Sequence, residues 1–363
     1  MLSPAGAGVP GRGRPYPLRM RYRTLGRTSI RVSEVGFGCW TMGGPNWSPE
    51  SGAPIGWADV NEADVRAGIK VGLDAGVNHW DNADVYGNGR AERMLAEVLR
   101  SLGIKRDTQV IATKVGHLRG SAIHAFDPRH IRNQCEQSLR NLRTDHIDLY
   151  YFHHGSYVGP GYDGAGDLVK DHDYLAEAAA TMRALVKEGK VRAVGQSAYS
   201  VEDFQRAVPV LKPDVLQNKA NLRYDEFIRP GSPMQALMAA HGCTFVAFGP
   251  LDQGILLDKF DPDKPPTFVE GDYRTNRKDF NPQTLRAVRD KLGQVKARFG
   301  ATPADTVDVL SSVASRWVLA HEHVCSVIPG FRNERQARCN LRAASDAPMS
   351  GADVEWLRQI FRA

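Results

Sequence analysis

Residues 78–89 read NHWDNADVYGNG, and they join a short β-rich segment to a glycine-rich loop. The segment, at 77–80, ends directly in a carboxylate, Asp81, and a phenol, Tyr86, follows five positions later. A helical pattern over 61–76 precedes the segment and another over 90–102 follows the loop. The stretch is therefore a strand–loop–helix unit with an acid at the tip of its strand.

The same strand–loop–helix unit recurs before and after this stretch of the sequence. The predicted strands are 35–38, 77–80, 109–113, 147–152, 191–195, 215–217, 244–248 and 324–328. The predicted helices are 61–76, 90–102, 128–142, 173–188, 201–211, 233–242, 303–320 and 333–345, with further helices near 282–299 and 351–361. Such alternation predicts a parallel sheet, and eight units favour a closed (β/α)8 TIM barrel of the α/β class. Residues 22–38 predict a β-hairpin that leads into the first strand.

The chain of 363 residues fits one such barrel with enlarged loops. We expect residues 1–20, rich in Gly, Pro and Arg, to be a disordered N-terminal extension, and residues 21–363 to be a single barrel domain. Three connections, 39–60, 154–172 and 249–281, are too long for simple loops. All three follow strands, so we expect them to form the walls of a substrate pocket at the C-terminal face.

Composition excludes several classes of function. The net charge is +6, but no aromatic residues interleave with a basic stripe, so we do not expect nucleic-acid binding. No apolar run has the length of a membrane helix, and we expect no membrane association. The five scattered cysteines indicate free thiols in a reducing compartment, and we expect a cytoplasmic protein. The oligomeric state stays open.

Polar residues end the successive strands of the predicted barrel. Strand tips carry Asp81, Lys114, His153 with His154, Ser197 and Gln217. The carboxyl ends of barrel strands meet at one face, which is where active sites of this fold lie. Because side chains alternate along a strand, only one of the two histidines should face the pocket.

These groups suggest a reaction at a carbonyl. An ammonium favours phenolate, so we expect Lys114, held by Asp81, to lower the pKa of Tyr86. Tyr86 would then donate a proton to a carbonyl oxygen that His153 orients. None of these side chains can supply hydride, so a cofactor is required.

The chain from about residue 22 to its C-terminus resembles the aldo-keto reductase superfamily. The resemblance lies in WDNADVYGNGRAE (80–92), ATK (112–114), DLYYFHH (148–154), VGQSAY (194–199), FGPLDQG (248–254) and VIPGFRNERQARCNLRA (327–343). It implies a catalytic tetrad of Asp81, Tyr86, Lys114 and His153.

The resemblance also implies a cofactor site for NADP, with NAD as the alternative. Ser197 and Gln217 would hold the nicotinamide carboxamide, and the ring would lie against Phe248. The pyrophosphate would pass along Gly249, Leu251 and Gly254. The adenosine end would lie among Gly330, Arg332, Gln336 and Asn340, with Arg332 near a 2′-phosphate.

The sequence departs from the family pattern at a few of these positions. Ala198 stands where the family usually has Asn, and Gln196 is a possible replacement for its hydrogen bond. Phe248 stands where Tyr is frequent, and the bulky Phe331 is next to the expected phosphate contact.

The resemblance predicts hydride transfer between a nicotinamide and a small-molecule carbonyl or alcohol. The enlarged loops favour a bulky or sugar-like substrate, with Trp40, Trp47 and His154 as substrate-binding residues. A cofactor-binding regulatory or redox-sensor subunit with little turnover, similar to the members of this superfamily that bind ion channels, is the alternative. A metal-dependent hydrolase ranks last, because the first strand tip reads Gly38-Cys39-Trp40 and lacks His-x-His. We therefore expect no metal.

Overall fold

The computed structural model describes residues 20–48 and 51–362. Apart from Met20, the predicted N-terminal extension lies outside these residues. Within the described ranges, eight parallel strands form one sheet in the order β12-β11-β10-β9-β6-β5-β4-β3. They are β3 (Phe37–Gly38), β4 (His79–Asp81), β5 (Val110–Val115), β6 (Ile147–Phe152), β9 (Val191–Ser197), β10 (Val215–Lys219), β11 (Thr244–Phe248) and β12 (Val324–Ile328).

The sheet closes on itself to form the predicted barrel. Parallel bridges join Val35 to Val327 and Gly38 to Gly330, at the two ends of the strand order. The amide of Gly36 donates to Val327 O at 2.9 Å, which continues the ladder across the seam. Closure brings the tips of the first and last strands together, as the (β/α)8 prediction requires.

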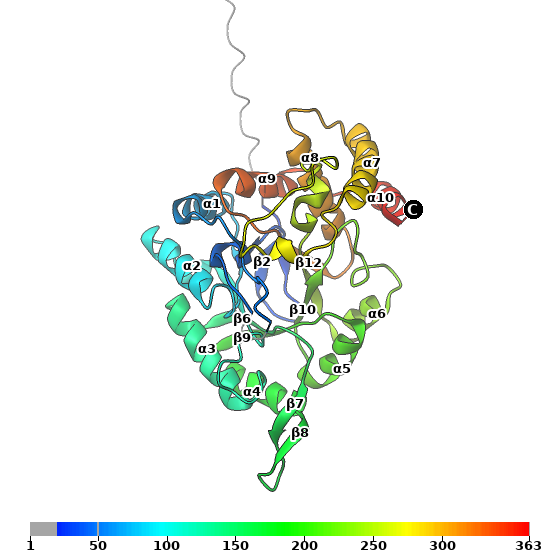
Figure 1. Cartoon of the computed structure of the whole chain (residues 1–363). Helices are drawn as coiled ribbons and strands as arrows, with labels where there is room; N and C mark the ends of the chain where they lie inside the picture. Colours follow the sequence, from blue (N-terminus) through cyan, green and yellow to red (C-terminus); the bar gives the residue numbers. More distant parts are fainter. Residues whose placement is uncertain (1–19, 49–50, 363) are drawn as a thin grey trace, which may run out of the picture.

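Helices surround the barrel (Figure 1). They are α1 (Glu62–Asp74), α2 (Arg90–Ser101), α3 (Pro128–Leu142), α4 (Leu175–Lys187), α5 (Val201–Leu211), α6 (Pro233–His241), α7 (Pro282–Phe299), α8 (Thr306–Leu319), α9 (Glu334–Ser345) and α10 (Gly351–Arg362). Side-chain caps fix several helix starts: Asn61, Ser200 and Asn333 each accept a hydrogen bond from an amide in the first turn of the helix that follows. Ten predicted helices therefore correspond to helices of the structure.

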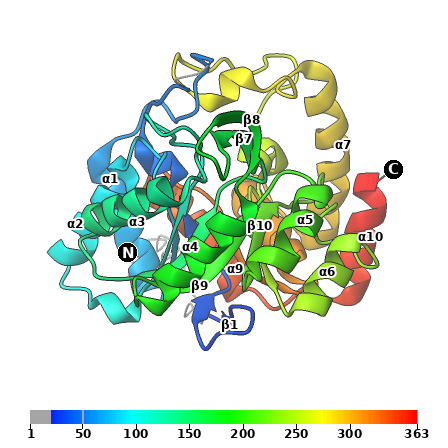
Figure 2. The same cartoon turned by 90° about the horizontal axis from the view of Figure 1, so that it is seen from below.

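A hairpin closes the bottom of the barrel. Strands β1 (Tyr22–Thr24) and β2 (Arg31–Ser33) pair antiparallel, as predicted. Three of the hairpin's residues, Leu25, Ile30 and Val32, are buried in one cluster with inward residues of the barrel strands. Figure 2 shows β1 at the end of the molecule opposite the long loops. The cluster fills the lower barrel with apolar side chains and leaves the upper end for polar ones.

Side chains alternate along each strand, so every second residue faces the barrel interior, and this series ends at the polar residues of the strand tips. Ala112 and Leu149 belong to the interior cluster, and two positions after Ala112 comes Lys114. The same spacing of two residues separates the interior residues Tyr151, Val215 and Val246 from the tip residues His153, Gln217 and Phe248, respectively. The residues predicted at the strand tips thus continue the barrel interior.

Two of the three long connections line the cavity described below. Residues of 39–60 and 249–281 contribute to its walls. These two loops also bind each other, through a bridge between Gly56 and Asp272 and a hydrogen bond from Asn276 Nδ2 to Pro54 O at 2.7 Å.

The prediction for the third connection was wrong, because none of residues 154–172 lines the cavity. Instead, β7 (Val158–Tyr162) and β8 (Leu168–Asp173) pair as an antiparallel hairpin. Figure 1 shows this hairpin projecting away from the barrel. The turn between its strands begins with Asp163-Gly164, a typical hairpin signal.

Two further observations concern the whole described chain. Within the described ranges, no helix combines the length and apolar character needed to cross a bilayer. Cys39, Cys135, Cys243, Cys325 and Cys339 are all buried and unpaired.

Asp148, at the start of β6, provides a test of the barrel's stability. Its buried carboxylate accepts from Arg106 Nη2 at 2.6 Å, from Arg192 Nη1 at 2.6 Å and from the amide of Ile111 at 2.9 Å. Asp148→Asn weakens three hydrogen bonds at a buried position, but the Arg106 and Arg192 side chains are 22% and 45% exposed and water compensates part of the loss, so the free energy of unfolding should fall by about 1–3 kcal/mol. Chemical denaturation measures this change. Asp145→Asn, whose side chain is 95% exposed, is the control and should change it by less than about 0.5 kcal/mol. Equal effects of the two variants would contradict the role of Asp148.

Candidate active site

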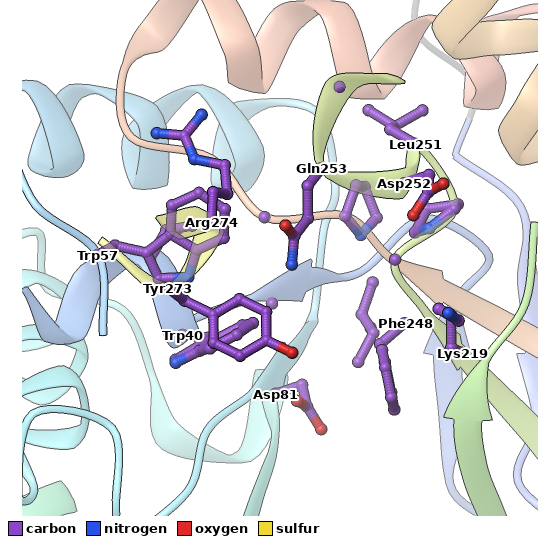
Figure 3. Close-up of a pocket in the computed structure, with 18 of the residues that line it drawn as sticks. Trp40, Trp57, Asp81, Lys219, Phe248, Leu251, Asp252, Gln253, Tyr273 and Arg274 are labelled. Carbon is purple, nitrogen blue, oxygen red and sulfur yellow. The ribbon is translucent and has the colours of Figure 1, made fainter. Parts of the chain in front are cut away.

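A cavity of about 970 Å³ opens at the carboxyl ends of the strands. Its walls come from the strand tips, from loops 39–60 and 249–281, and from the segment that joins β12 to α9. Figure 3 shows Trp40, Trp57 and Tyr273 gathered on one side of this cavity, with Phe248 and Lys219 on the other. Gln253 lies between the two groups.

A buried ion pair lies at the bottom of the cavity. Lys114 is fully buried and Asp81 is 2% exposed. The Lys114 ammonium donates to Asp81 Oδ2 at 2.6 Å, to Asn82 O at 2.7 Å and to the Tyr86 hydroxyl at 3.2 Å. The side-chain amide of Gln217 donates to the other oxygen, Asp81 Oδ1, at 2.8 Å. All three protons of the ammonium have acceptors, so its position beside the phenol is fixed.

The sequence-based expectation for the acidity of Tyr86 was wrong in direction. Burial, and then the charge of Asp81, raise the pKa of Tyr86 well above its usual value. Burial disfavours the charged phenolate, and Asp81 already balances the Lys114 charge, so the ammonium does not offset these effects. Tyr86 therefore keeps its proton across the neutral range and serves as a hydrogen-bond donor.

The side chains of His153 and His154 lie in different environments. His153 lines the cavity, and its ring packs edge-on to the ring of Tyr86 at 5.9 Å between centroids. Burial, and then the nearby His117, hold the pKa of His153 well below its usual value, so the ring is neutral. His154 lies outside the cavity lining and forms a hydrogen bond between Nε2 and Gly116 O at 3.0 Å. The four residues of the predicted tetrad lie together, and His154 lies apart from the substrate space.

The predicted nicotinamide contacts also lie around the cavity. Ser197, Gln217 and Phe248 all line it. Gln196 does not, since its amide nitrogen donates to His154 O at 3.1 Å and its oxygen accepts from Tyr157. Gln196 is therefore unable to replace the missing Asn hydrogen bond in this arrangement.

The segment after β11 is strained where it lines the cavity. Asp252, Gln253 and Gly254 have φ values of 46°, 55° and 96°, which non-glycine residues seldom adopt. Ion pairs from Arg223 and Arg277 to the buried Asp252 carboxylate hold this turn in place. Strain of this kind is typical of ligand-binding segments.

Positive charge gathers at the outer end of the cavity, where Lys259, Arg274 and Arg332 contribute to the lining. Arg274 pairs with Asp272 at 2.7 Å, but Lys259 and Arg332 have no ion-pair partner within residues 20–48 and 51–362. Burial, followed by the charge of Arg274, lowers the pKa of Arg332 and of Lys259. A bound anion would relieve this repulsion, so these residues fit the phosphate groups of a dinucleotide.

The other predicted residues divide between the cavity and its surroundings. Gly249, Leu251, Gly254, Gly330, Gln336 and Asn340 line it, as does Trp40. Trp40 stacks nearly parallel to Tyr86, with ring centroids 6.3 Å apart. Trp47 lies outside the lining and is 47% exposed.

Sequence reasoning missed several lining residues. Lys219 follows Gln217 at the strand period of two, so alternation along β10 could have identified it. Lys259, Arg274, His117 and Tyr199 belong to loops, where no periodicity marks the direction of a side chain. In the part of the chain that the structure describes, no cluster of three or more His, Cys, Asp or Glu residues could hold a metal ion.

Comparison with known proteins identifies the family of this chain. The model of the aldo/keto reductase family matches residues 34–361. The chain is 27% identical over 346 residues to a probable voltage-gated potassium channel subunit beta of Oryza sativa subsp. japonica, covering 92% of this chain and 94% of that protein.

Two further proteins are similar over nearly their whole length. The chain is 26% identical to the NADH-specific methylglyoxal reductase of Escherichia coli strain K12, covering 95% of this chain and 99% of that protein. The structure of the glycerol dehydrogenase AKR11B4 from Gluconobacter oxydans superposes with a TM-score of 0.70 at 24% identity, over 93% of this chain and 94% of that one. This last likeness supports the fold.

Gly87 fixes the loop that carries Tyr86. Its φ is +58°, and a Cβ atom there would lie 2.1 Å from Gly43 O. Gly103 has a similar φ of +65° with nothing within 4 Å, so Gly103→Ala isolates the backbone strain. We predict that Gly87→Ala lowers the free energy of unfolding by about 1–3 kcal/mol more than Gly103→Ala does, because the added carbon meets backbone. Denaturant titration of both variants measures the difference, and equal losses would contradict the close packing of the two loops.

Proposed function

We propose a function for this chain on the basis that it belongs to the aldo/keto reductase family. It is accordingly an oxidoreductase that uses a nicotinamide cofactor and acts on a carbonyl or alcohol. The finer proposal is that the chain uses NADPH and that Tyr86 is its proton donor. The observation that supports it best is the hydrogen bond from the buried Lys114 ammonium to the Tyr86 hydroxyl.

In this proposal the four tetrad residues act on the carbonyl oxygen. Tyr86 and the neutral His153 bind that oxygen and polarise the C=O bond. The cofactor, when bound, supplies hydride to the carbonyl carbon, and the Tyr86 proton completes the alcohol. The Lys114 ammonium, 3.2 Å from the phenol oxygen, then stabilises the phenolate that remains. Asp81 keeps Lys114 in that position.

The cofactor would lie along the cavity from Ser197 and Phe248 to the cationic end. Phe248 offers an aromatic face to a flat ring, and Ser197 offers a hydroxyl to a carboxamide. The unpaired charges of Lys259 and Arg332 favour the additional phosphate of NADP over NAD. The five unpaired cysteines support a cytoplasmic location.

We propose a bulky or sugar-like carbonyl substrate on the side of the cavity formed by Trp40, Trp57 and Tyr273. Trp40 packs edge-on to Trp57 at 5.5 Å and to Tyr273 at 4.9 Å, which forms an aromatic wall above Tyr86. Such a wall suits a flat or ring-shaped carbonyl compound.

A second candidate function is a cofactor-binding regulatory subunit. The relative from Oryza sativa subsp. japonica, described as a probable channel subunit beta, favours it. Tight NADPH binding without turnover of any aldehyde or ketone would favour this alternative, and steady turnover would favour the reductase.

The proton-donor role is tested by Tyr86→Phe. This variant keeps the ring that packs on Trp40 and removes the hydroxyl, so turnover of an aldehyde should fall by about 10²- to 10⁴-fold. The dissociation constant for NADPH, measured by fluorescence titration, is the control and should stay within about twofold. Normal reduction without the hydroxyl would overturn the assignment.

The role of Arg332 is tested by Arg332→Leu. Loss of a charged phosphate contact should weaken NADPH binding by about 10- to 100-fold and change NADH binding by less than about twofold. Arg338→Leu is the matched control, since Arg338 is on the exposed side of α9, pairs with Glu334 and lies outside the cavity lining. Equal weakening of both cofactors by Arg332→Leu would count against a phosphate contact.

A further inference from the structure

We infer that His117 and Tyr199 form a hydroxyl-binding pair that selects carbonyl substrates with a hydroxyl group close to the carbonyl. This inference rests on the proposed reductase function and names a substrate class for it. Neither residue belongs to the proposed tetrad or to the proposed cofactor contacts.

The two residues meet across the mouth of the cavity. His117 follows β5 and Tyr199 follows β9, and both line the cavity. His117 Nε2 and the Tyr199 hydroxyl are 2.9 Å apart, in a hydrogen bond. Tyr199 is 57% exposed and lines the cavity, so a ligand that enters the cavity meets this residue.

The pair is adjacent to the position of the reacting carbonyl. The ring of His117 packs on that of His153 with 4.5 Å between centroids. The His153 ring in turn packs on Tyr86 at 5.9 Å. In the proposed complex, Tyr86 and His153 hold the carbonyl oxygen, and a hydroxyl group on a neighbouring carbon is directed to His117.

The chemistry of the pair matches a hydroxyl group. Loss of hydration, together with the nearby His154 and Lys114, lowers the pKa of His117 to about 4, so the ring is neutral at physiological pH. A neutral imidazole and a phenol share one hydrogen bond, and the phenol keeps at least one further site for donating or accepting. An incoming hydroxyl, which both donates and accepts, satisfies that site in either tautomer of His117. A methyl or methylene group at the same position displaces water from that site and offers no hydrogen bond in return.

The cavity also has an aromatic wall, and one of its members, Tyr273, is close enough to Tyr199 to raise the pKa of the Tyr199 phenol further, after burial. Trp40 and Tyr273 lie on one side, as Figure 3 shows, and both are aromatic. A substrate with a C–H face and a hydroxyl-bearing edge can place the face on these rings and the edge on His117 and Tyr199. This arrangement fits a hydroxylated aldehyde or ketone better than an aliphatic one of equal length.

The test compares 2-hydroxypropanal with propanal, which differ by one hydroxyl group. With NADPH, the kcat/KM of the unaltered protein should be about three- to tenfold higher for the hydroxylated aldehyde, after correction for the free aldehyde fraction.

Tyr199→Phe should remove this preference, mainly by raising the KM for the hydroxylated aldehyde, and should leave propanal reduction within about twofold. His117→Leu should remove the preference too, and the double variant should lose no more, because the two residues act as one unit.

Tyr162→Phe is the matched control. Tyr162 is 56% exposed, much like Tyr199, but belongs to the β7–β8 hairpin outside this cavity. It should leave the preference unchanged. If the unaltered protein does not discriminate, or if Tyr199→Phe lowers the kcat/KM for both substrates equally, the inference is wrong while the reductase proposal stands. If NADPH reduces neither aldehyde, the inference is wrong, and the proposed function fails as well only if ring-shaped aldehydes and ketones are not reduced either.

Discussion

The buried ion pair between Lys114 and Asp81 is the interaction on which the rest of the site depends. Burying two charges is costly, and the pair persists because each partner has further hydrogen bonds, from Lys114 to Asn82 O and from Gln217 to Asp81. The barrel supplies these partners, since strands β4, β5 and β10 all end at the same face. The result is a cation with no freedom to move, 3.2 Å from the Tyr86 oxygen.

Charge is distributed differently at the two ends of the cavity. At the inner end Asp81 neutralises Lys114, so the surroundings suit an uncharged carbonyl and a protonated phenol. At the outer end Lys259 and Arg332 stay without ion-pair partners among the described residues, which favours an anion. A dinucleotide with a phosphate-rich end and a neutral redox ring matches this gradient along its length. The strained turn at 252–254 lies on the same wall, held by ion pairs of Asp252.

How much the sequence predicts depends on whether a residue lies on a strand or in a loop. The barrel follows from the alternation of strands and helices. The proximity of Asp81, Lys114 and His153 follows from the alternation of side chains along each strand, because inward residues are apolar at its base and polar at its tip. The hairpin at 158–173 was missed although its Asp163-Gly164 turn is a local signal. The meeting of His117 with Tyr199, and of Arg274 with Arg332, depends on loops packing across the barrel mouth, and no local pattern encodes that. The direction of the pKa shift of Tyr86 was misjudged because the sequence indicates which charges are near but not how far the partly buried phenol is shielded from water.

The pH dependence of kcat/KM for carbonyl reduction shows whether Tyr86, beside the paired Lys114, reacts as a protonated phenol. Tyr86 must be protonated to act, and its pKa is raised above the usual value of about 10, so activity should fall only above that pH. His153 acts as a neutral ring, and its pKa is lowered well below 6.5, so no loss should occur on the acid side until well below that pH. We therefore expect a plateau in kcat/KM across the neutral range between these limits. A one-proton loss of activity centred between about pH 7 and 9, absent in a control reaction that does not use Tyr86, would contradict it.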